Sequence, residues 1–206
     1  TITVKGKRIR FRGDWRNADG NFRELFSGTF VGVHNVTMSG GFDFDGAPAT
    51  GMFYGTFRYC GSLTGSIPSG LFGNLSGAPA GDMFRVTFDG CGKLTGSIPS
   101  GLFGDISGAP ATGMFAFTFF GCSNLTGSIP SGLFGDVSGT PAFAMFYGTF
   151  QGCSKLTSIP VGLFGSISGA PASYMFANTF QSCSNLTGSI PVGLFGSISG
   201  APASYM

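Results

Sequence analysis

The sequence repeats itself every 31 residues over most of its 206 positions. A fixed period of about 20–50 residues is typical of proteins built from stacked structural repeats, so a repeat solenoid is predicted. The cysteines in this pattern are Cys60, Cys91, Cys122, Cys153 and Cys183, and the methionines are Met52, Met83, Met114, Met145, Met175 and Met206. The last cysteine interval is 30, because Leu156–Pro160 lacks a glycine that the equivalent segments contain.

One repeat, residues 83–110, indicates a β-rich unit with sharp corners. Val86–Phe88 alternates and is rich in β-forming residues, which predicts a short strand. Pro99 and Pro110 lie next to glycines and indicate corners, and Ser100–Phe103 is interpreted as one helical or 3₁₀ turn. About nine positions are apolar in every repeat. One unit cannot bury both of its faces, so we expect the repeats to stack, with short parallel strands and few helical turns.

The chain is expected to contain three parts. Residues 1–24 are interpreted as an N-terminal β-hairpin cap, with Trp15 packed against the first repeat. Residues 25–51 form a degenerate first repeat in which Val33 replaces the cysteine, and residues 52–206 form about five repeats, the last truncated. Seven of the eleven basic residues lie in the first 23 positions, where we expect them to solubilise the end of an apolar stack. No nucleic-acid partner is expected.

Composition restricts the possible classes of protein. Charged residues make up only 10% of the chain, which argues against intrinsic disorder. No uninterrupted apolar run reaches the length of about 18 residues that would indicate a transmembrane segment.

The repeats also resemble a known family. Met114, Phe117, Phe119, Cys122 and Leu125 fit the cysteine form of the leucine-rich-repeat core, LxxLxLxxCxxL. The aromatic residue before x-x-Cys-x-x-Leu and the Ser-Ile-Pro corner that follows are similar to the BspA-like leucine-rich-repeat family of bacterial surface proteins. The resemblance covers residues 25–206 and departs from the family pattern by an insertion that contains Gly-Leu-Phe-Gly and Gly-Ala-Pro-Ala. It implies a secreted or surface-attached protein that binds host proteins or other cells.

The residue types needed for catalysis or metal binding are sparse. The single histidine, His34, has no evident partner for nucleophilic catalysis, so no enzyme activity is expected. Asp43 and Asp45 lack the flanking ligands of a calcium loop, so a solvated loop is the preferred interpretation. The cysteines are expected to be reduced and buried, and they lack the Cys-x-x-Cys spacing of zinc sites. No cofactor and no metal are predicted.

Two positions beside the predicted strand differ between repeats, whereas the framework barely changes. Such positions are expected to face solvent on the side that stacked-repeat proteins use for recognition. The candidate binding face contains Tyr54, Arg58, Tyr59, Arg85, Asp89, Phe120, Tyr147, Gln151 and Gln181. The alternative is that exposed positions vary without functional consequence.

An invariant threonine column, Thr56, Thr87, Thr118, Thr149 and Thr179, allows two interpretations. It could form a flat ice- or carbohydrate-binding surface, but cross-strand packing is preferred. The chain ends at Met206 within a repeat, so either further repeats follow or this end docks on another copy. We therefore predict a secreted or cell-surface protein that adheres to extracellular proteins or glycans. The alternative is a subunit that assembles with its own copies into a filament or surface layer.

Overall fold

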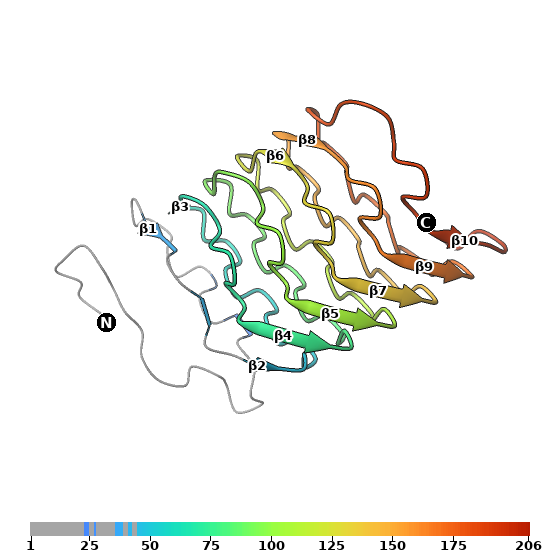
Figure 1. Ribbon diagram of the computed structural model, residues 1–206. Helices are drawn as coiled ribbons and strands as arrows, with labels where there is room; N and C mark the ends of the chain where they lie inside the picture. Colours follow the sequence, from blue (N-terminus) through green and yellow to red (C-terminus); the bar gives the residue numbers. More distant parts are fainter. Residues whose placement is uncertain (1–22, 25–26, 28–35, 39–40, 43–44) are drawn as a thin grey trace.

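The computed structural model describes residues 23–24, 27, 36–38, 41–42 and 45–206. Successive repeats lie side by side in Figure 1, and the arrows of equivalent strands point the same way. These described residues contain strands and turns but no helix. The predicted N-terminal hairpin, Trp15, Val33, His34 and Asp43 lie outside the described residues.

The largest sheet has six parallel strands in the order β10-β9-β7-β5-β4-β2. Its strands are β2 (Asp45–Gly46), β4 (Asn74–Gly77), β5 (Asp105–Gly108), β7 (Asp136–Gly139), β9 (Ser166–Gly169) and β10 (Ser197–Ile198). Each pair joins one repeat to the next. In β5, Ile106 is buried between exposed Asp105 and Ser107, as expected for a half-buried strand.

Two smaller parallel sheets lie at another corner of the repeats. The first pairs β1 (Val36–Thr37) with β3 (Leu63–Thr64), and the second pairs β6 (Gly127–Ser128) with β8 (Leu156–Ser158). The register shifts between Gly127 and Ser128, opposite the segment that lacks a glycine. The missing residue is therefore accommodated at a corner. These sheets, together with the larger one, confirm the prediction of a β-rich fold with short parallel strands.

The strand predicted at Val86–Phe88 is wrong, because this part of each repeat consists of consecutive hydrogen-bonded turns. The Thr87 N–H donates to the Phe84 carbonyl at 3.3 Å and closes a turn, whereas the Val86 N–H donates to the Ala116 carbonyl of the next repeat at 2.9 Å. Val86 has a positive φ of 51° at the third residue of its turn, where a type II turn requires one. We call the five equivalent stretches, residues 51–60, 82–91, 113–122, 144–153 and 174–183, the turn segments.

Burial explains why a strand does not form there. Met83, Phe84, Thr87 and Phe88 are all completely buried, so adjacent residues point to the same side. In a strand, neighbouring side chains point to opposite sides, and one member of each pair would be exposed. Turns that recur every four residues allow both members of each pair to reach the core.

The predicted helical turns are also absent from the described residues. Ser100–Phe103 lies in a hydrogen-bonded turn, which the Gly104 N–H closes by donating to the Gly101 carbonyl at 3.1 Å. Gly101 has a φ of 64°, in the left-handed region, and this prevents a right-handed helix from continuing through this corner.

The nine apolar positions predicted for a repeat are confirmed as the core in residues 83–110, whereas in the last repeat Ile190 and Phe195 are exposed. In residues 83–110 they are Met83, Phe84, Phe88, Cys91, Leu94, Ile98, Leu102, Phe103 and Ile106, and each is at most 2% exposed. Phenylalanines at three of these positions stack on their equivalents in the next repeat. Ring centroids are separated by 5.5 Å for Phe84–Phe115 and for Phe88–Phe119, and by 6.0 Å for Phe103–Phe134. Three continuous phenylalanine columns therefore form the centre of the stack.

The invariant threonines are buried, so they cannot form an ice- or carbohydrate-binding surface. The Thr118 hydroxyl lies 2.9 Å from the Phe115 carbonyl of its own repeat and 2.9 Å from the Phe84 carbonyl of the preceding repeat. The same arrangement recurs at Thr87, Thr149 and Thr179. Each hydroxyl therefore satisfies buried backbone acceptors at the contact between repeats, and the invariance reflects this role.

The cysteines are buried and reduced, as predicted. The Cys122 thiol lies 3.2 Å from the Phe88 carbonyl of the preceding repeat. Burial is the main cause of the raised pKa values of Cys91, Cys122 and Cys153, and it raises the pKa of Cys183 to about 11. The thiolate is the reactive form, so these cysteines are expected to react slowly in the folded protein.

This gives a prediction for alkaline pH. Thiols with a raised folded pKa stabilise the fold fully below their ordinary pKa of 9.0, and that stabilisation is lost as the pH rises through the folded value. The free energy of unfolding should therefore fall above about pH 9, by up to about 1.4 kcal/mol per pH unit for each thiol. Urea unfolding at a series of pH values measures the slope. Cys122→Ala should reduce it by the share of one thiol, and an unchanged slope would contradict the assignment.

Candidate binding face

The turn segments present the residues that vary between repeats. Between the buried pairs of each segment lie residues that point away from the core, and most of them are partly or fully exposed, although Val86 and Ala116 are buried. We call these outward residues together the turn face. Tyr59, Phe120 and Gln181 are exposed, whereas Tyr54, Arg58, Arg85, Tyr147 and Gln151 are half-buried. The predicted residues thus lie on the turn segments, although the strand that was expected to hold them is absent.

Asp89 is the exception, because its side chain is only 9% exposed. Its carboxylate accepts a hydrogen bond from Arg58 Nε of the preceding repeat at 2.9 Å. Burial raises the pKa of the Asp89 carboxyl, and the hydrogen bond from Arg58 opposes that shift. Asp89 therefore links two repeats instead of presenting a free charge to a ligand.

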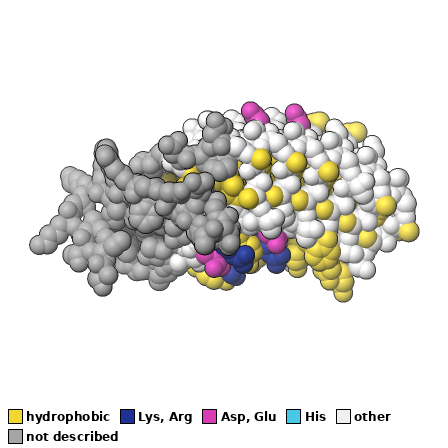
Figure 2. All heavy atoms as spheres, turned by 90° about the horizontal axis from the view of Figure 1, so that it is seen from below, with side chains coloured by type: hydrophobic (Ala, Val, Ile, Leu, Met, Phe, Trp, Pro, Cys, Tyr) yellow, Lys and Arg dark blue, Asp and Glu magenta, His cyan; other side chains and the backbone are white. Residues whose placement is uncertain are grey.

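The charged part of the turn face belongs to the first two turn segments and is largely paired. Arg58 also donates to the Tyr59 hydroxyl at 2.7 Å, and its guanidinium lies 4.4 Å from the centre of that ring. Arg85 contacts Asp82 at 3.3 Å. Figure 2 shows basic and acidic side chains side by side along one edge of the molecule, with hydrophobic side chains further along the same edge.

The later repeats bring six aromatic rings together in what we call the aromatic cluster. Its members are Phe117, Phe120, Phe143, Tyr147, Tyr174 and Tyr205. Ring centroids are 4.5 Å apart for Phe117–Tyr147, 5.6 Å for Tyr147–Tyr174 and 4.8 Å for Tyr174–Tyr205. Phe143 is 50% exposed and Tyr205 is 71% exposed. Aromatic side chains of this kind are enriched where proteins bind partners.

Four members of the aromatic cluster, Phe117, Phe143, Tyr174 and Tyr205, were not among the predicted binding residues. Phe117 and Tyr174 have positive φ values, at turn positions that hold glycine in some other repeats. A period of four in the turn segment, with two residues inward and two outward, would have placed both of them on the surface. The sequence predicts a strand here, in which side chains alternate with a period of two, and that prediction does not identify these two outward residues.

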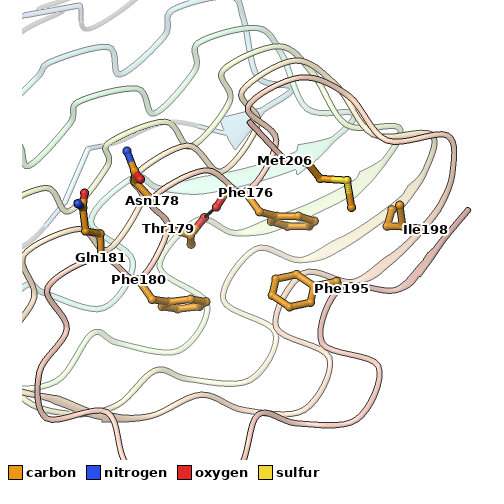
Figure 3. Close-up of a pocket in the computed structure, with 8 residues that line it drawn as sticks. All are labelled: Phe176, Asn178, Thr179, Phe180, Gln181, Phe195, Ile198 and Met206. Carbon is orange, nitrogen blue, oxygen red and sulfur yellow. Dashed lines mark hydrogen bonds between the residues drawn. The ribbon is translucent and has the colours of Figure 1, made fainter. Parts of the chain in front are cut away.

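A second apolar surface lies at the last repeat. Figure 3 shows Phe176, Phe180, Phe195 and Met206 around one hollow, whose other lining residues are Asn178, Thr179, Gln181 and Ile198. Phe176, Phe180 and Phe195 are the last members of the three phenylalanine columns. In earlier repeats, the corresponding space is filled by the phenylalanines of the next repeat.

The described residues contain no group of three or more histidine, cysteine or acidic side chains arranged to hold a metal ion. The same part of the chain has no helix that is long and apolar enough to cross a membrane. No protein-family model, curated protein or solved structure matches this sequence.

Proposed function

We propose that this chain is a non-catalytic, leucine-rich-repeat-like solenoid that binds extracellular proteins or glycans through its turn face. The observation behind the proposal is the exposed aromatic cluster, which occupies variable positions on a nearly constant framework. Continuous phenylalanine columns and parallel strands that join successive repeats support the solenoid. The first repeat proposed at residues 25–51 is supported by the pairing of β1 with β3 and of β2 with β4.

An extracellular location is part of the proposal, and the sequence resemblance to BspA-like surface proteins supports it. Buried cysteines with raised pKa values are compatible with an oxidising environment, because their thiolates are scarce and shielded. The leucine-rich-repeat form of the solenoid remains a prediction. In that pattern Phe117 and Phe119 would both point inward, yet Phe117 is half-exposed with a φ of 55°, whereas Phe119 is buried.

A binding screen with two variants tests the proposal. Purified chain is applied to immobilised extracellular-matrix proteins and to a glycan array. Phe120→Ala with Tyr147→Ala should weaken binding about tenfold or more, because aromatic residues often dominate the free energy of binding. Val192→Ala is the matched surface control, since Val192 is 95% exposed and lies outside the turn segments. Equal binding by the double variant and the control would contradict a role for the turn face.

Self-assembly is a second candidate, because the repeats are nearly identical and residues 162–175 and 193–206 have the same sequence. A repeat from a second copy would offer aromatic rings with the same spacing. Light scattering during size-exclusion chromatography of the same samples separates the two candidates. Filaments or a mass that grows with concentration support assembly, and a constant mass near 21.2 kDa excludes it for this chain.

A further inference from the structure

The turn face is divided by charge along the stack. Its charged residues in the full repeats are Arg58, Asp82, Arg85 and Asp89, all in the first two turn segments. The three later segments, 113–122, 144–153 and 174–183, contain no lysine, arginine, aspartate or glutamate. The aromatic cluster is built mainly on these uncharged segments. A ligand that covers it there meets no ionised side chain of the turn segments.

The polar groups beside the rings are neutral amides and hydroxyls. Gln151 donates a hydrogen bond from its side-chain amide to the side-chain oxygen of Gln181. Gln181 and Asn178 are exposed, next to the segment that contains Tyr147. Amides donate and accept hydrogen bonds, and phenol groups do the same. The surface therefore offers apolar ring surface together with uncharged donors and acceptors.

This combination suits one class of ligand best. The sugar units of a neutral glycan have apolar C–H faces, which pack on aromatic rings, and hydroxyl groups, which pair with amides. An acidic polymer would need cations to compensate its charge, and the only arginines of the full-repeat turn segments, Arg58 and Arg85, already contact Asp89 and Asp82. The uncharged protein surface therefore matches an uncharged polysaccharide.

We propose that the aromatic cluster, with Gln151, Asn178 and Gln181, binds a neutral polysaccharide that runs along the stack of repeats. The inference rests on the proposed binding function and specifies its ligand class. Equivalent rings in adjacent turn segments have centroids 5.5 Å apart, as Phe84–Phe115 and Phe88–Phe119 show. A linear polymer along this direction can therefore contact rings from several repeats at once.

Affinity electrophoresis of the full chain tests the inference. Gels contain a neutral polysaccharide (hydroxyethylcellulose, laminarin, galactomannan or dextran) or an anionic one (alginate or heparin). At least one neutral polymer should retard the chain, and added salt should leave the affinity unchanged, because no ion pair is formed. Tyr147→Ala with Tyr174→Ala should weaken that binding about tenfold or more, which corresponds to about 1.4 kcal/mol. Tyr147→Phe with Tyr174→Phe keeps the rings and should change affinity less than threefold.

Two results would overturn the inference. Retardation only by alginate or heparin, lost at high salt, would identify an anionic ligand, and no retardation by any polymer would exclude polysaccharides of the classes tested. If matrix proteins bind through the aromatic cluster while no glycan does, the proposed binding function survives and the glycan inference fails. Gln181→Glu tests the same surface in a variant that should fold normally, because Gln181 is exposed and the change adds charge without removing core contacts. It should weaken the retardation by the neutral polymer, whereas an unchanged mobility would contradict the amide contact.

Discussion

Phe103→Ala is expected to lower the free energy of unfolding by about 3–5 kcal/mol, the usual cost of removing a buried phenylalanine ring. The Phe103 ring is completely buried and lies among rings of its own and the neighbouring repeats. Its centroid is 4.4 Å from Phe84, 4.9 Å from Phe115, 5.8 Å from Phe72 and 6.0 Å from Phe134. Repeats in a stack contact only their neighbours, so the cavity also weakens the coupling between the two halves of the chain. Urea unfolding followed by circular dichroism measures the loss.

Phe195→Ala is the matched control, because Phe195 occupies the same position in the last repeat. Its side chain is 42% exposed, and its nearest column neighbour is Phe164 at 6.2 Å. Less buried area is lost, so we expect a cost of about 1 kcal/mol. Similar losses for the two variants would show that the inner phenylalanines do not stabilise the stack more than the last one does. A broader transition in Phe103→Ala alone would indicate that the halves unfold separately.

The core could be predicted from the sequence because each position of the repeat can be compared with its equivalents in the other repeats. The positions equivalent to Met83, Phe84, Phe88 and Cys91 remain apolar in every full repeat, and burial is the simplest cause. The position of the strands could not be predicted in the same way. A polar threonine between two apolar residues, as in Val86–Phe88, resembles the alternation of a half-buried strand. The Thr87 side chain is nevertheless buried, because its hydroxyl pairs with backbone carbonyls in the core. A buried threonine next to a buried phenylalanine therefore gave a misleading pattern.

Comparison between repeats also predicted part of the candidate site. Variation between repeats correctly selected Tyr147 and Phe120 as outward residues. It did not select Phe117, because equivalent positions hold Gly55 and Gly148, and glycine there indicates only a turn. The pairing of Asp89 with Arg58 could not be predicted from the sequence either, because the two residues belong to different repeats, 31 positions apart. Contacts of this kind depend on the register between repeats, which the sequence period alone does not define.

Gly135→Ala is expected to destabilise the fold by about 2–5 kcal/mol, through steric overlap and an unfavourable backbone conformation. A Cβ atom at Gly135 would lie 2.1 Å from the Ile106 carbonyl oxygen of the preceding strand. That oxygen belongs to the backbone, so relief of the overlap requires the two repeats to separate. Gly135 also has a φ of 69°, in the left-handed region that alanine rarely adopts. Thermal and urea unfolding of the variant measure the loss of stability.

Gly132→Ala separates these two causes. Gly132 lies three residues earlier at a φ of 64°, but a Cβ atom there would meet nothing within 4 Å. Its substitution therefore tests the backbone conformation alone, at a cost of about 1–2 kcal/mol that the reduced entropy of the unfolded chain partly offsets. The difference between the two variants measures how closely adjacent repeats approach at this corner. If Gly135→Ala and Gly132→Ala lose equal stability, contact between the repeats does not require glycine at position 135, and the left-handed turn alone accounts for its presence in every repeat.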